Sequence, residues 1–330
     1  MPLIMVTGAA GFIGSVVTQK LLDEGVEVLA VDNLSRGHRV AIAEGATFYR
    51  INVGDASALE KIFGQYKVDA VVHLAGFTQV GESVENPALY YSNNLRDGLT
   101  LLETMNRCGI SKMIFSSSAA VYGTPSQNPI AEDHPIVPMN PYGATKAVME
   151  NALVWYGKAY GLQSVSLRYF NAAGASGSLG ENHHPETHLI PTAIDVAQGK
   201  LDYLSIYGDD YPTPDGTAIR DYVHVEDIAQ AHIQTLEALG HLPRREYNIG
   251  TGKGYSVREV TDMASRVCLA DIPVEIMPRR VGDPSELVAD ASALQKDLGW
   301  IPQISSIERI IQDAYRWHRD QNRTLPRNQM

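Results

Sequence analysis

Short apolar runs alternate with longer amphipathic segments through the first half of the chain. The runs have the length of strands, and the segments between them repeat their apolar residues at helical spacing. We predict strands at Leu3–Thr7, Glu27–Asp32, Thr47–Asn52, Ala70–Ala75, Met113–Ser117 and Ser164–Tyr169. We predict helices at Gly14–Glu24, Ala56–Gln65, Pro87–Arg107 and Tyr142–Tyr160. Because near-continuous apolar runs such as residues 70–74 are typical of strands buried on both faces, the pattern predicts an α/β fold with a Rossmann-type, doubly wound parallel sheet.

This rhythm breaks after about Gly174. Small and polar residues crowd residues 174–188, and residues 211–216 form a Pro-rich turn. Since 330 residues exceed one core of ordinary size, we predict two domains, a Rossmann domain over residues 1–176 and a smaller α/β domain over residues 177–330. The segments Tyr222–Leu239 and Tyr247–Gly250 resemble sheet again, so parts near residues 220–250 are expected to return to the first domain.

Composition narrows the class of protein. The formal net charge of −11 argues against a nucleic-acid partner, because phosphate backbones attract clustered Lys and Arg. Only two cysteines occur, which fits a reducing compartment without disulfides. The apolar start is short and lacks a basic leader, and no stretch approaches the ~18 apolar residues that a membrane span needs. The sequence therefore predicts a cytoplasmic protein with no membrane partner.

A glycine-rich loop follows the first predicted strand and opens the first predicted helix, with glycines at Gly8, Gly11 and Gly14. The first two permit a tight turn close to a pyrophosphate, the third permits close packing of helix and strand, and the free N–H groups of the helix start attract phosphate. The spacing differs from the usual Gly-x-Gly-x-x-Gly, and glycines alone also occur in ordinary strand–helix turns.

The second strand supplies an acidic partner for this loop. Asp32 stands at its end, where a carboxylate accepts a hydrogen bond from a ribose hydroxyl and repels a 2′-phosphate. The sequence therefore predicts a dinucleotide site that prefers NAD to NADP. Arg36 is near enough to weaken this preference, but a lone loop arginine is expected to be solvated.

A candidate catalytic set lies further along the chain. Tyr142 and Lys146 are four residues apart and so share one helix face, and Ser118 follows the fifth strand at the sheet edge where ligands bind. Hydride transfer from an alcohol requires a base, but free tyrosine titrates near about 10. A shift of about three units, about 4 kcal/mol, can come from Lys146 and the positive nicotinamide ring. Chance Tyr-x-x-x-Lys pairs occur on many helices, and the preceding dinucleotide loop favours the catalytic interpretation.

Further strings run through the whole chain: Val80–Val84, Phe115–Gly123, Leu167–Asn171, Asp209–Thr217, Arg220–Val225, Ala289–Ala291 and Leu298–Trp300. With the features above, they resemble the extended short-chain dehydrogenase/reductase family and, within it, the UDP-glucose 4-epimerases. The resemblance implies an isomerase that interconverts UDP-glucose and UDP-galactose with tightly bound NAD. Such an enzyme would belong to galactose metabolism and, more broadly, to carbohydrate metabolism. Tyr142 would take the 4-hydroxyl proton as hydride leaves, and the resulting 4-keto sugar would turn before hydride returns.

The resemblance also assigns residues to ligands. NAD contacts are expected at Gly8, Gly11, Phe12, Ile13, Gly14, Asp32, Asn33, Asn52, Val53, Leu74, Ala75, Gly76, Asn93, Ser118, Tyr142, Lys146 and Tyr169. Nucleotide-sugar contacts are expected at Asn171, His188, Leu189, Tyr207, Arg220, Tyr222, Arg280, Asp283 and Leu287. Two of these, Arg220 and Arg280, are cations suited to a diphosphate, although ordinary salt bridges would equally explain them.

Departures from the family pattern limit the chemistry. Ser118-Ala119-Ala120 replaces the Asp-Glu pair with which related dehydratases eliminate water, so dehydration is not expected. Ala120 also replaces a threonine of some epimerases. Leu287 is intermediate between residues linked to acceptance or rejection of acetamido sugars, so that question stays open.

The cluster His183, His184 and His188 resembles a loop that enters a helix with Thr187 as its cap, and the sequence predicts no metal site there. Trp155 and Tyr156 are expected in the core or in a dimer contact, since the two long helices suit the four-helix homodimer that the resemblance implies. Three alternatives to the main function remain at this stage: an epimerase of N-acetylated or other nucleotide sugars, a net nucleotide-sugar dehydrogenase, and a sensor without catalysis. The intact Ser–Tyr–Lys set argues against the sensor.

Overall fold

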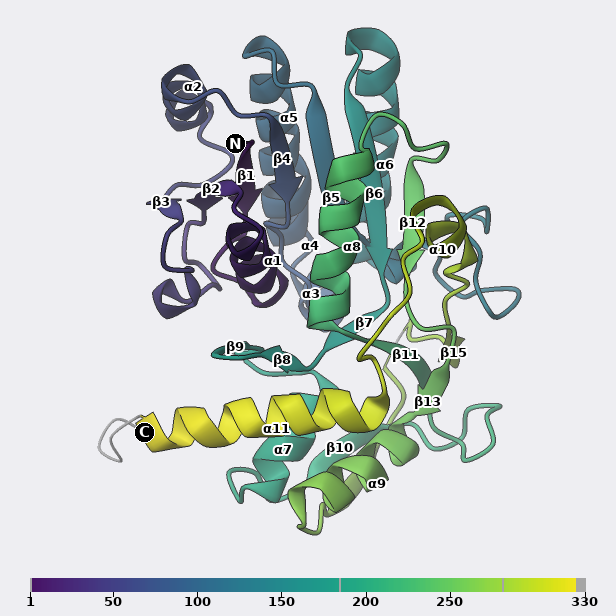
Figure 1. Cartoon of the computed structure of the whole chain (residues 1–330). Helices are drawn as coiled ribbons and strands as arrows, with labels where there is room; N and C mark the ends of the chain where they lie inside the picture. Colours follow the sequence, from purple (N-terminus) through teal and green to yellow (C-terminus); the bar gives the residue numbers. More distant parts are fainter. Residues whose placement is uncertain (1, 184, 281, 325–330) are drawn as a thin grey trace.

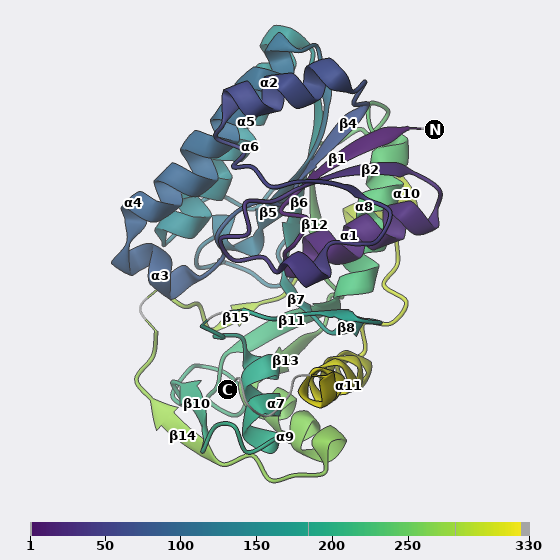
Figure 2. The ribbon, with the colours of Figure 1, turned by 90° about the vertical axis from the view of Figure 1, so that its left-hand side faces the viewer.

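The computed structural model describes residues 2–183, 185–280 and 282–324 of the chain. A large parallel sheet flanked by helices forms one part, and a smaller group of strands and helices lies against the carboxyl edge of this sheet (Figures 1 and 2). The long helix α11 (Ile307–Thr324) crosses the smaller part.

The large sheet has seven strands, all paired in parallel. Their order is β12 (Glu246–Ile249), β6 (Gln163–Tyr169), β5 (Lys112–Ser118), β4 (Ala70–His73), β1 (Leu3–Thr7), β2 (Glu27–Val31) and β3 (Thr47–Tyr49). Sequential strands 1 to 6 thus follow the 3-2-1-4-5-6 order of a dinucleotide-binding sheet. Strands β1 to β3 follow one another toward one side of the sheet, and β4 to β6 follow one another toward the other side. A crevice forms at such a switch point, here between β1 and β4. The predicted Rossmann-type sheet is confirmed.

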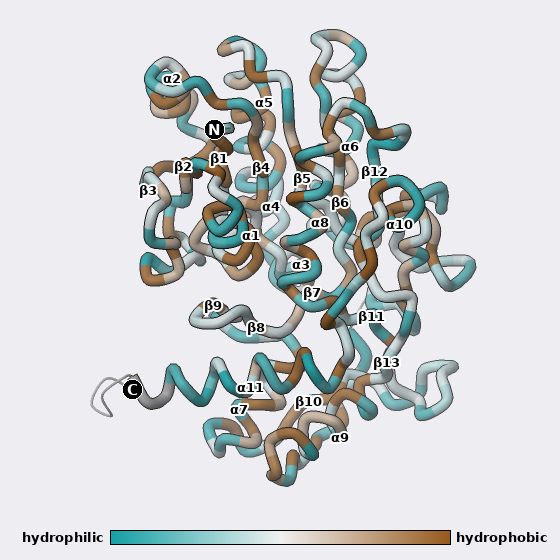
Figure 3. Tube along the Cα trace, viewed as in Figure 1, coloured by the Kyte–Doolittle hydropathy of each residue, from teal (hydrophilic) through white to brown (hydrophobic). Residues whose placement is uncertain are grey.

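Apart from the edge strand β3, the strands of this sheet are buried on both faces. In β1, Ile4 and Val6 join the core beneath α1 (Phe12–Asp23) and α8 (Val225–Ala238), whereas Met5 faces the opposite core. That opposite core is covered by three helices, which Figure 2 shows on the other side of the sheet: α2 (Ala56–Gln65), α5 (Asp97–Arg107) and α6 (Pro141–Tyr160). The hydrophobic stretches of the chain run through these strands (Figure 3). Burial on both faces explains why the strands read as apolar runs.

The smaller part has its own core. Its helices α7 (Leu189–Ala197), α9 (Val257–Cys268) and α11 pack around Ile190, Val260 and Ile310. Its strands are β7 (Asn171–Ala173), β8 (Ala175–Ser176), β9 (Leu179–Gly180), β10 (Leu204–Tyr207), β11 (Ile219–His224), β13 (Gly254–Ser256), β14 (Val274–Met277) and β15 (Glu286–Leu287). The predicted domain boundary at residues 176 and 177 falls between β8 and β9 and stays a prediction.

Two short helices and a π-helical segment connect β4 to α5. The predicted helix over residues 87–107 consists of α4 (Pro87–Tyr90), the π-helical segment η2 (Tyr91–Arg96) and α5. It is preceded by α3 (Val80–Glu85), and two 3₁₀ turns lie elsewhere, η1 (Arg39–Ala41) and η3 (Ala119–Val121). Segments of π-helix are frequent at functional sites.

The expectation of sheet over Tyr222–Leu239 was wrong for most of that range. Only the start belongs to β11, and the chain then forms α8. The Nδ1 atom of His224 caps this helix by accepting a hydrogen bond from the backbone nitrogen of Glu226 at 3.1 Å. Buried Val225, Ile228 and His232 recur at helical spacing. The helix packs on α1, the short helix α10 (Ser292–Leu298) packs against β12 and α8, and β12 completes the large sheet. Within the described residues, none of the helices is long and apolar enough to span a membrane.

Candidate active site

A cleft of about 1460 Å³ lies between the carboxyl edge of the large sheet and the smaller part. Its wall on the sheet side comes from the loops after β1, β2, β4 and β5 and from the start of α6. Its opposite wall comes from β7, the loop before α7, β11 and the segment around Arg280. This is the position in which open α/β sheets bind their ligands.

The glycine loop is shaped by close backbone contacts. Gly8 has φ +71°, and a Cβ there would lie 2.6 Å from the nitrogen of Ala75. A Cβ on Gly14 would overlap the carbonyl oxygen of Gly8. A Cβ on Gly11 would meet only that oxygen, at 3.3 Å, and Gly11 lines the cleft at the start of α1. A phosphate approaching the helix N-terminus therefore finds free N–H groups and no side chain in its way.

Asp32 fixes this loop to the end of β2. Its carboxylate accepts hydrogen bonds from the backbone nitrogens of Ala10 at 3.0 Å and Leu34 at 2.7 Å, and it lines the cleft. The expectation that Arg36 is solvated was wrong, because its guanidinium pairs with Glu82 at 2.5 Å and lies over the ring of Phe77. An arginine held by a carboxylate is less available to a 2′-phosphate, which agrees with NAD as the cofactor. The loop, the carboxylate and the helix N-terminus fit a dinucleotide.

The candidate catalytic residues meet at the cleft floor. Asn140 caps α6 by accepting a hydrogen bond from the nitrogen of Gly143 at 2.9 Å, which places Tyr142 in the first turn of the helix. Ser118 ends β5 and lines the cleft with Tyr142. Burial raises the pKa of Tyr142, and a hydrogen bond with Ser118 opposes that rise. In the cofactor-free protein Tyr142 is therefore a neutral phenol, and positive charge is needed to make it a base.

Lys146 lies behind Tyr142 and brings a positive charge near its ring. Its ammonium donates to the carbonyl oxygen of Ser116 at 2.7 Å and stands 5.9 Å from the centre of the Tyr142 ring. Burial lowers the pKa of Lys146 to about 8, and Glu150 partly opposes this change. The lysine is therefore mostly protonated at neutral pH, although its side chain is buried.

Residues that the sequence did not reveal support this floor. Glu150, one helical turn beyond Lys146, forms a buried ion pair with Arg168 at 2.7 Å and accepts from the hydroxyl of Ser117 at 2.5 Å. Asn94, in the π-helical segment, is buried and bonds both backbone groups of Phe77 at 2.8 and 2.9 Å. Only the folded chain brings these residues together, so no spacing along the sequence pointed to them.

The opposite wall carries the predicted cations. Arg220 on β11 pairs with Asp283 at 2.5 Å, and Arg280 lies over the ring of Tyr207, 4.0 Å from its centre. Tyr222 is buried beside them, and burial raises its pKa. The wall thus combines two guanidinium groups with aromatic surfaces, a set suited to an anionic ligand that also carries a ring.

Most of the predicted site residues line this single cleft. On the dinucleotide side they are Gly8, Gly11, Phe12, Ile13, Gly14, Asp32, Asn33, Leu74, Ala75, Gly76, Asn93, Ser118, Tyr142 and Tyr169. On the opposite side they are Asn171, His188, Leu189, Tyr207, Arg220, Tyr222, Arg280, Asp283 and Leu287. Three others lie outside the cleft wall: Lys146 is buried behind Tyr142, Val53 is in the core, and Asn52 is exposed and accepts from the nitrogen of Gly54. Their binding roles stay predictions. Thr187 does not cap α7, which begins after His188.

The fold and the cleft define a class, the enzymes of the short-chain dehydrogenase/reductase type that hold a nicotinamide dinucleotide. The profile of the "NAD dependent epimerase/dehydratase family" matches residues 4–250. The chain is 48% identical over 318 residues to the UDP-glucose 4-epimerase of Lacticaseibacillus casei, a match that covers 96% of each chain. It belongs to this family and, within it, to the UDP-glucose 4-epimerases.

Solved structures agree with this assignment. UDP-glucose 4-epimerase from Brucella ovis in complex with NAD superposes with a TM-score of 0.91 at 43% identity, covering 96% of this chain and 98% of that one. The enzyme from Bifidobacterium longum in complex with NAD+ and UDP superposes with a TM-score of 0.92 at 38% identity, covering 98% and 100%.

Proposed function

We propose that the protein is an NAD-dependent isomerase that interconverts UDP-glucose and UDP-galactose by inverting carbon 4 of the sugar. The observation that carries the proposal is the meeting of Ser118 and Tyr142 at the floor of the cleft, with Lys146 buried behind Tyr142 and two arginines on the opposite wall. The relatives named above are UDP-glucose 4-epimerases, which supports this substrate over other nucleotide sugars and over net dehydrogenation.

The reaction divides between the two walls of the cleft. The glycine loop and Asp32 would hold NAD, which when bound would supply the acceptor and then the donor of the hydride exchanged with carbon 4, so that this carbon is reduced again from its opposite face. Tyr142 takes the proton of the 4-hydroxyl group, helped by the charge of Lys146, and later returns it to the keto oxygen. Ser118 holds the oxygen in place by hydrogen bonding. The protein atoms therefore move one proton out and back, and no net oxidation results.

Retention of the nucleotide is the task of the other wall. Arg220 and Arg280 would bind the diphosphate through charge-assisted hydrogen bonds, and Tyr207 and Tyr222 would contact the nucleotide. In this proposal the sugar makes fewer contacts than the diphosphate, so that it can turn inside the cleft while the nucleotide stays bound. Asn171, His188, Leu189, Asp283 and Leu287 complete the proposed binding wall.

The test is to incubate the purified protein with UDP-galactose, without added NAD, and to separate the nucleotide sugars by chromatography. We expect a mixture of UDP-glucose and UDP-galactose, and we expect Tyr142→Phe to form it at least about 100-fold more slowly, the usual contribution of a general base. Accumulation of NADH would instead indicate a net dehydrogenase. Failure to convert UDP-galactose even with NAD supplied would refute the proposal.

We also propose that the protein forms a homodimer in the cytoplasm through α5 and α6. Large apolar side chains of α6 are exposed in the single chain, with Trp155 at 59%, Tyr160 at 60% and Val148 at 46%. A monomeric protein rarely exposes several such residues on one helix. Light scattering should give twice the 36.1 kDa chain mass, and Trp155→Glu should shift it to the monomer mass.

A further inference from the structure

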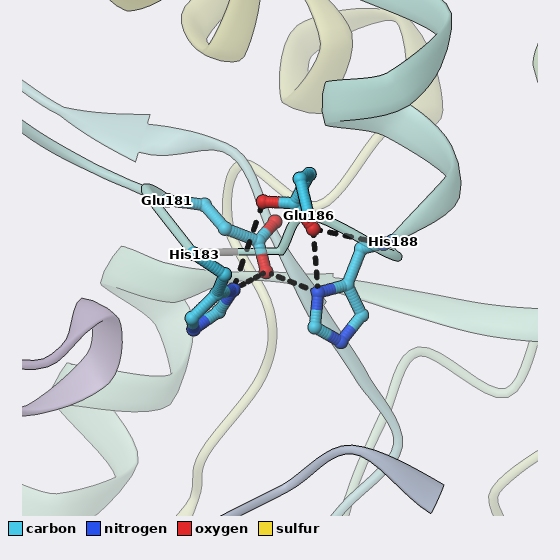
Figure 4. Close-up of side chains that lie close together, drawn as sticks. All are labelled: Glu181, His183, Glu186 and His188. Atoms are coloured by element: carbon cyan, nitrogen blue, oxygen red, sulfur yellow. Dashed lines mark hydrogen bonds and ion pairs between the residues drawn. The ribbon is translucent and has the colours of Figure 1, made fainter. Parts of the chain in front are cut away.

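Four side chains with metal-ligating atoms meet in the loop between β9 and α7. Glu181, His183, Glu186 and His188 each offer one atom, and these four atoms lie within 4.8 Å of one another (Figure 4). From the sequence we predicted no metal site here, because the run of His183, His184 and His188 was interpreted as a loop that enters a helix. Of these three histidines, His184 lies outside the described residues. The folded loop turns back on itself and brings the four together.

Four of the separations lie near those that one small cation imposes, within a cluster whose atoms spread over at most 4.8 Å. The Nδ1 atom of His188 lies 3.0 Å from Glu181 and 3.1 Å from Glu186, and the Nδ1 atom of His183 lies 3.3 and 3.7 Å from the same two carboxylates. Tetrahedral bonds of about 2.0–2.2 Å to zinc separate neighbouring ligand atoms by about 3.3–3.6 Å. A small movement of the side chains would complete this geometry.

Hydrogen bonds within the loop explain part of the arrangement, because Glu186 accepts from the backbone nitrogens of Thr187 at 2.7 Å and His188 at 2.8 Å. Each Nδ1 atom carries at most one hydrogen, yet each faces two carboxylates. The side chains of Glu181 and Glu186 are 7% and 16% exposed, so two carboxylates are held close together away from water. A divalent cation between them satisfies both carboxylates and both imidazoles at once.

From this geometry we infer that the loop binds one zinc ion through Glu181, His183, Glu186 and His188. Four protein ligands fill a tetrahedral site and leave no position for substrate, so the ion is structural and takes no part in the reaction. The second ring nitrogen of His188 points away from the carboxylates (Figure 4), so His188 remains able to contact a ligand in the cleft.

The loop that would bind the ion contacts the Rossmann part of the protein. The carbonyl oxygen of Asn182 is hydrogen-bonded to the ring of His38 at 2.8 Å, and that of Pro185 accepts from the side chain of Gln79 at 2.8 Å. Both partners belong to the Rossmann part, whereas the loop leads into α7 of the smaller part. Zinc would therefore stiffen a segment that joins the two walls of the cleft.

The experiment uses the full-length protein with its bound NAD. The protein is treated with a chelator, freed of it by gel filtration, and titrated with zinc chloride under calorimetry and by elemental analysis after a second filtration. We expect one zinc per chain in the wild type and in the control His241→Ala, which removes an exposed histidine elsewhere. We expect His183→Ala and Glu186→Gln each to weaken zinc binding at least tenfold.

A second measurement distinguishes loss of zinc binding from loss of folding in the variants. Zinc should raise the thermal unfolding midpoint of the wild type and of His241→Ala but not that of the two ligand variants, while the content of bound NAD shows that each variant is folded. Equal zinc content in wild type and His183→Ala, or no uptake by the wild type, would overturn the inference. Because the readouts are metal content and stability, failure here is distinct from failure of the proposed epimerase activity.

Discussion

Replacing Lys146 by methionine tests how Tyr142 becomes a base. The ammonium stands 5.9 Å from the centre of the tyrosine ring. With the phenolate charge placed at the ring centre and an effective dielectric constant of about 20, the two unit charges attract by about 3 kcal/mol, which equals about 2 pKa units. Lys146→Met keeps most of the buried stem and removes the charge. The pKa of Tyr142 in the NAD-bound enzyme before substrate binds should therefore rise by about 2 units.

The assay is kcat/KM for UDP-galactose as a function of pH. The acid limb of the profile should move to higher pH by about 2 units in Lys146→Met. At pH values below the pKa of Tyr142, kcat/KM of the variant should therefore be about 100-fold lower than that of the wild type, and the difference should shrink as the pH rises. The pKa of Lys146 is lowered to about 8, so its ammonium is lost above that pH; the wild type should decline there and the variant should not. Lys146→Arg, which keeps the charge, serves as the control. An equal loss at every pH, with no movement of the limb, would refute this reasoning.

Three further substitutions test the supporting structure. Gly8→Ala places a Cβ 2.6 Å from a backbone nitrogen at a residue with φ +71°, so the variant should purify with little bound NAD, measured after release by heat. An NAD content equal to that of the wild type would contradict the predicted role of the glycine loop. Arg168→Met leaves Glu150 buried without its cation and should lower the free energy of unfolding in urea by about 3–5 kcal/mol. An unchanged urea midpoint would show that the ion pair between Arg168 and Glu150 contributes nothing to the free energy of unfolding. Arg220→Met removes charge-assisted hydrogen bonds worth about 1.5–3 kcal/mol, so KM for UDP-galactose should rise about 10- to 100-fold, more than kcat falls. A fall in kcat alone would move Arg220 away from ground-state binding.

The parts of the site that could be predicted are those encoded within one short segment. The glycine loop, Asp32 at a strand end, and Tyr142 four residues before Lys146 each combine a local conformation with a fixed spacing. The parallel sheet followed from strands that are apolar on both faces. Such signals survive without knowledge of tertiary structure because the physical constraint acts between neighbours in the chain.

The remainder depends on contacts between distant segments. Arg168 and Glu150 meet only because β6 and α6 pack together, and the four ligands of the β9–α7 loop meet only because that loop folds back. The prediction of sheet in place of α8 was wrong for a different reason. The spacing of Val225, Ile228 and His232 is a local signal for one face of a helix, and this helix packs on α1.

The central claim is that carbon 4 is oxidised and reduced again within one closed site. The most direct measurement is to supply UDP-galactose carrying deuterium at carbon 4 to the protein as purified, and to follow the label in UDP-glucose by mass spectrometry and NMR. The account predicts that deuterium stays on carbon 4 of the product, because the same hydride leaves and returns while only the hydroxyl proton passes through Tyr142. Loss of deuterium to the solvent would contradict the account and would indicate inversion by removal of a proton from carbon.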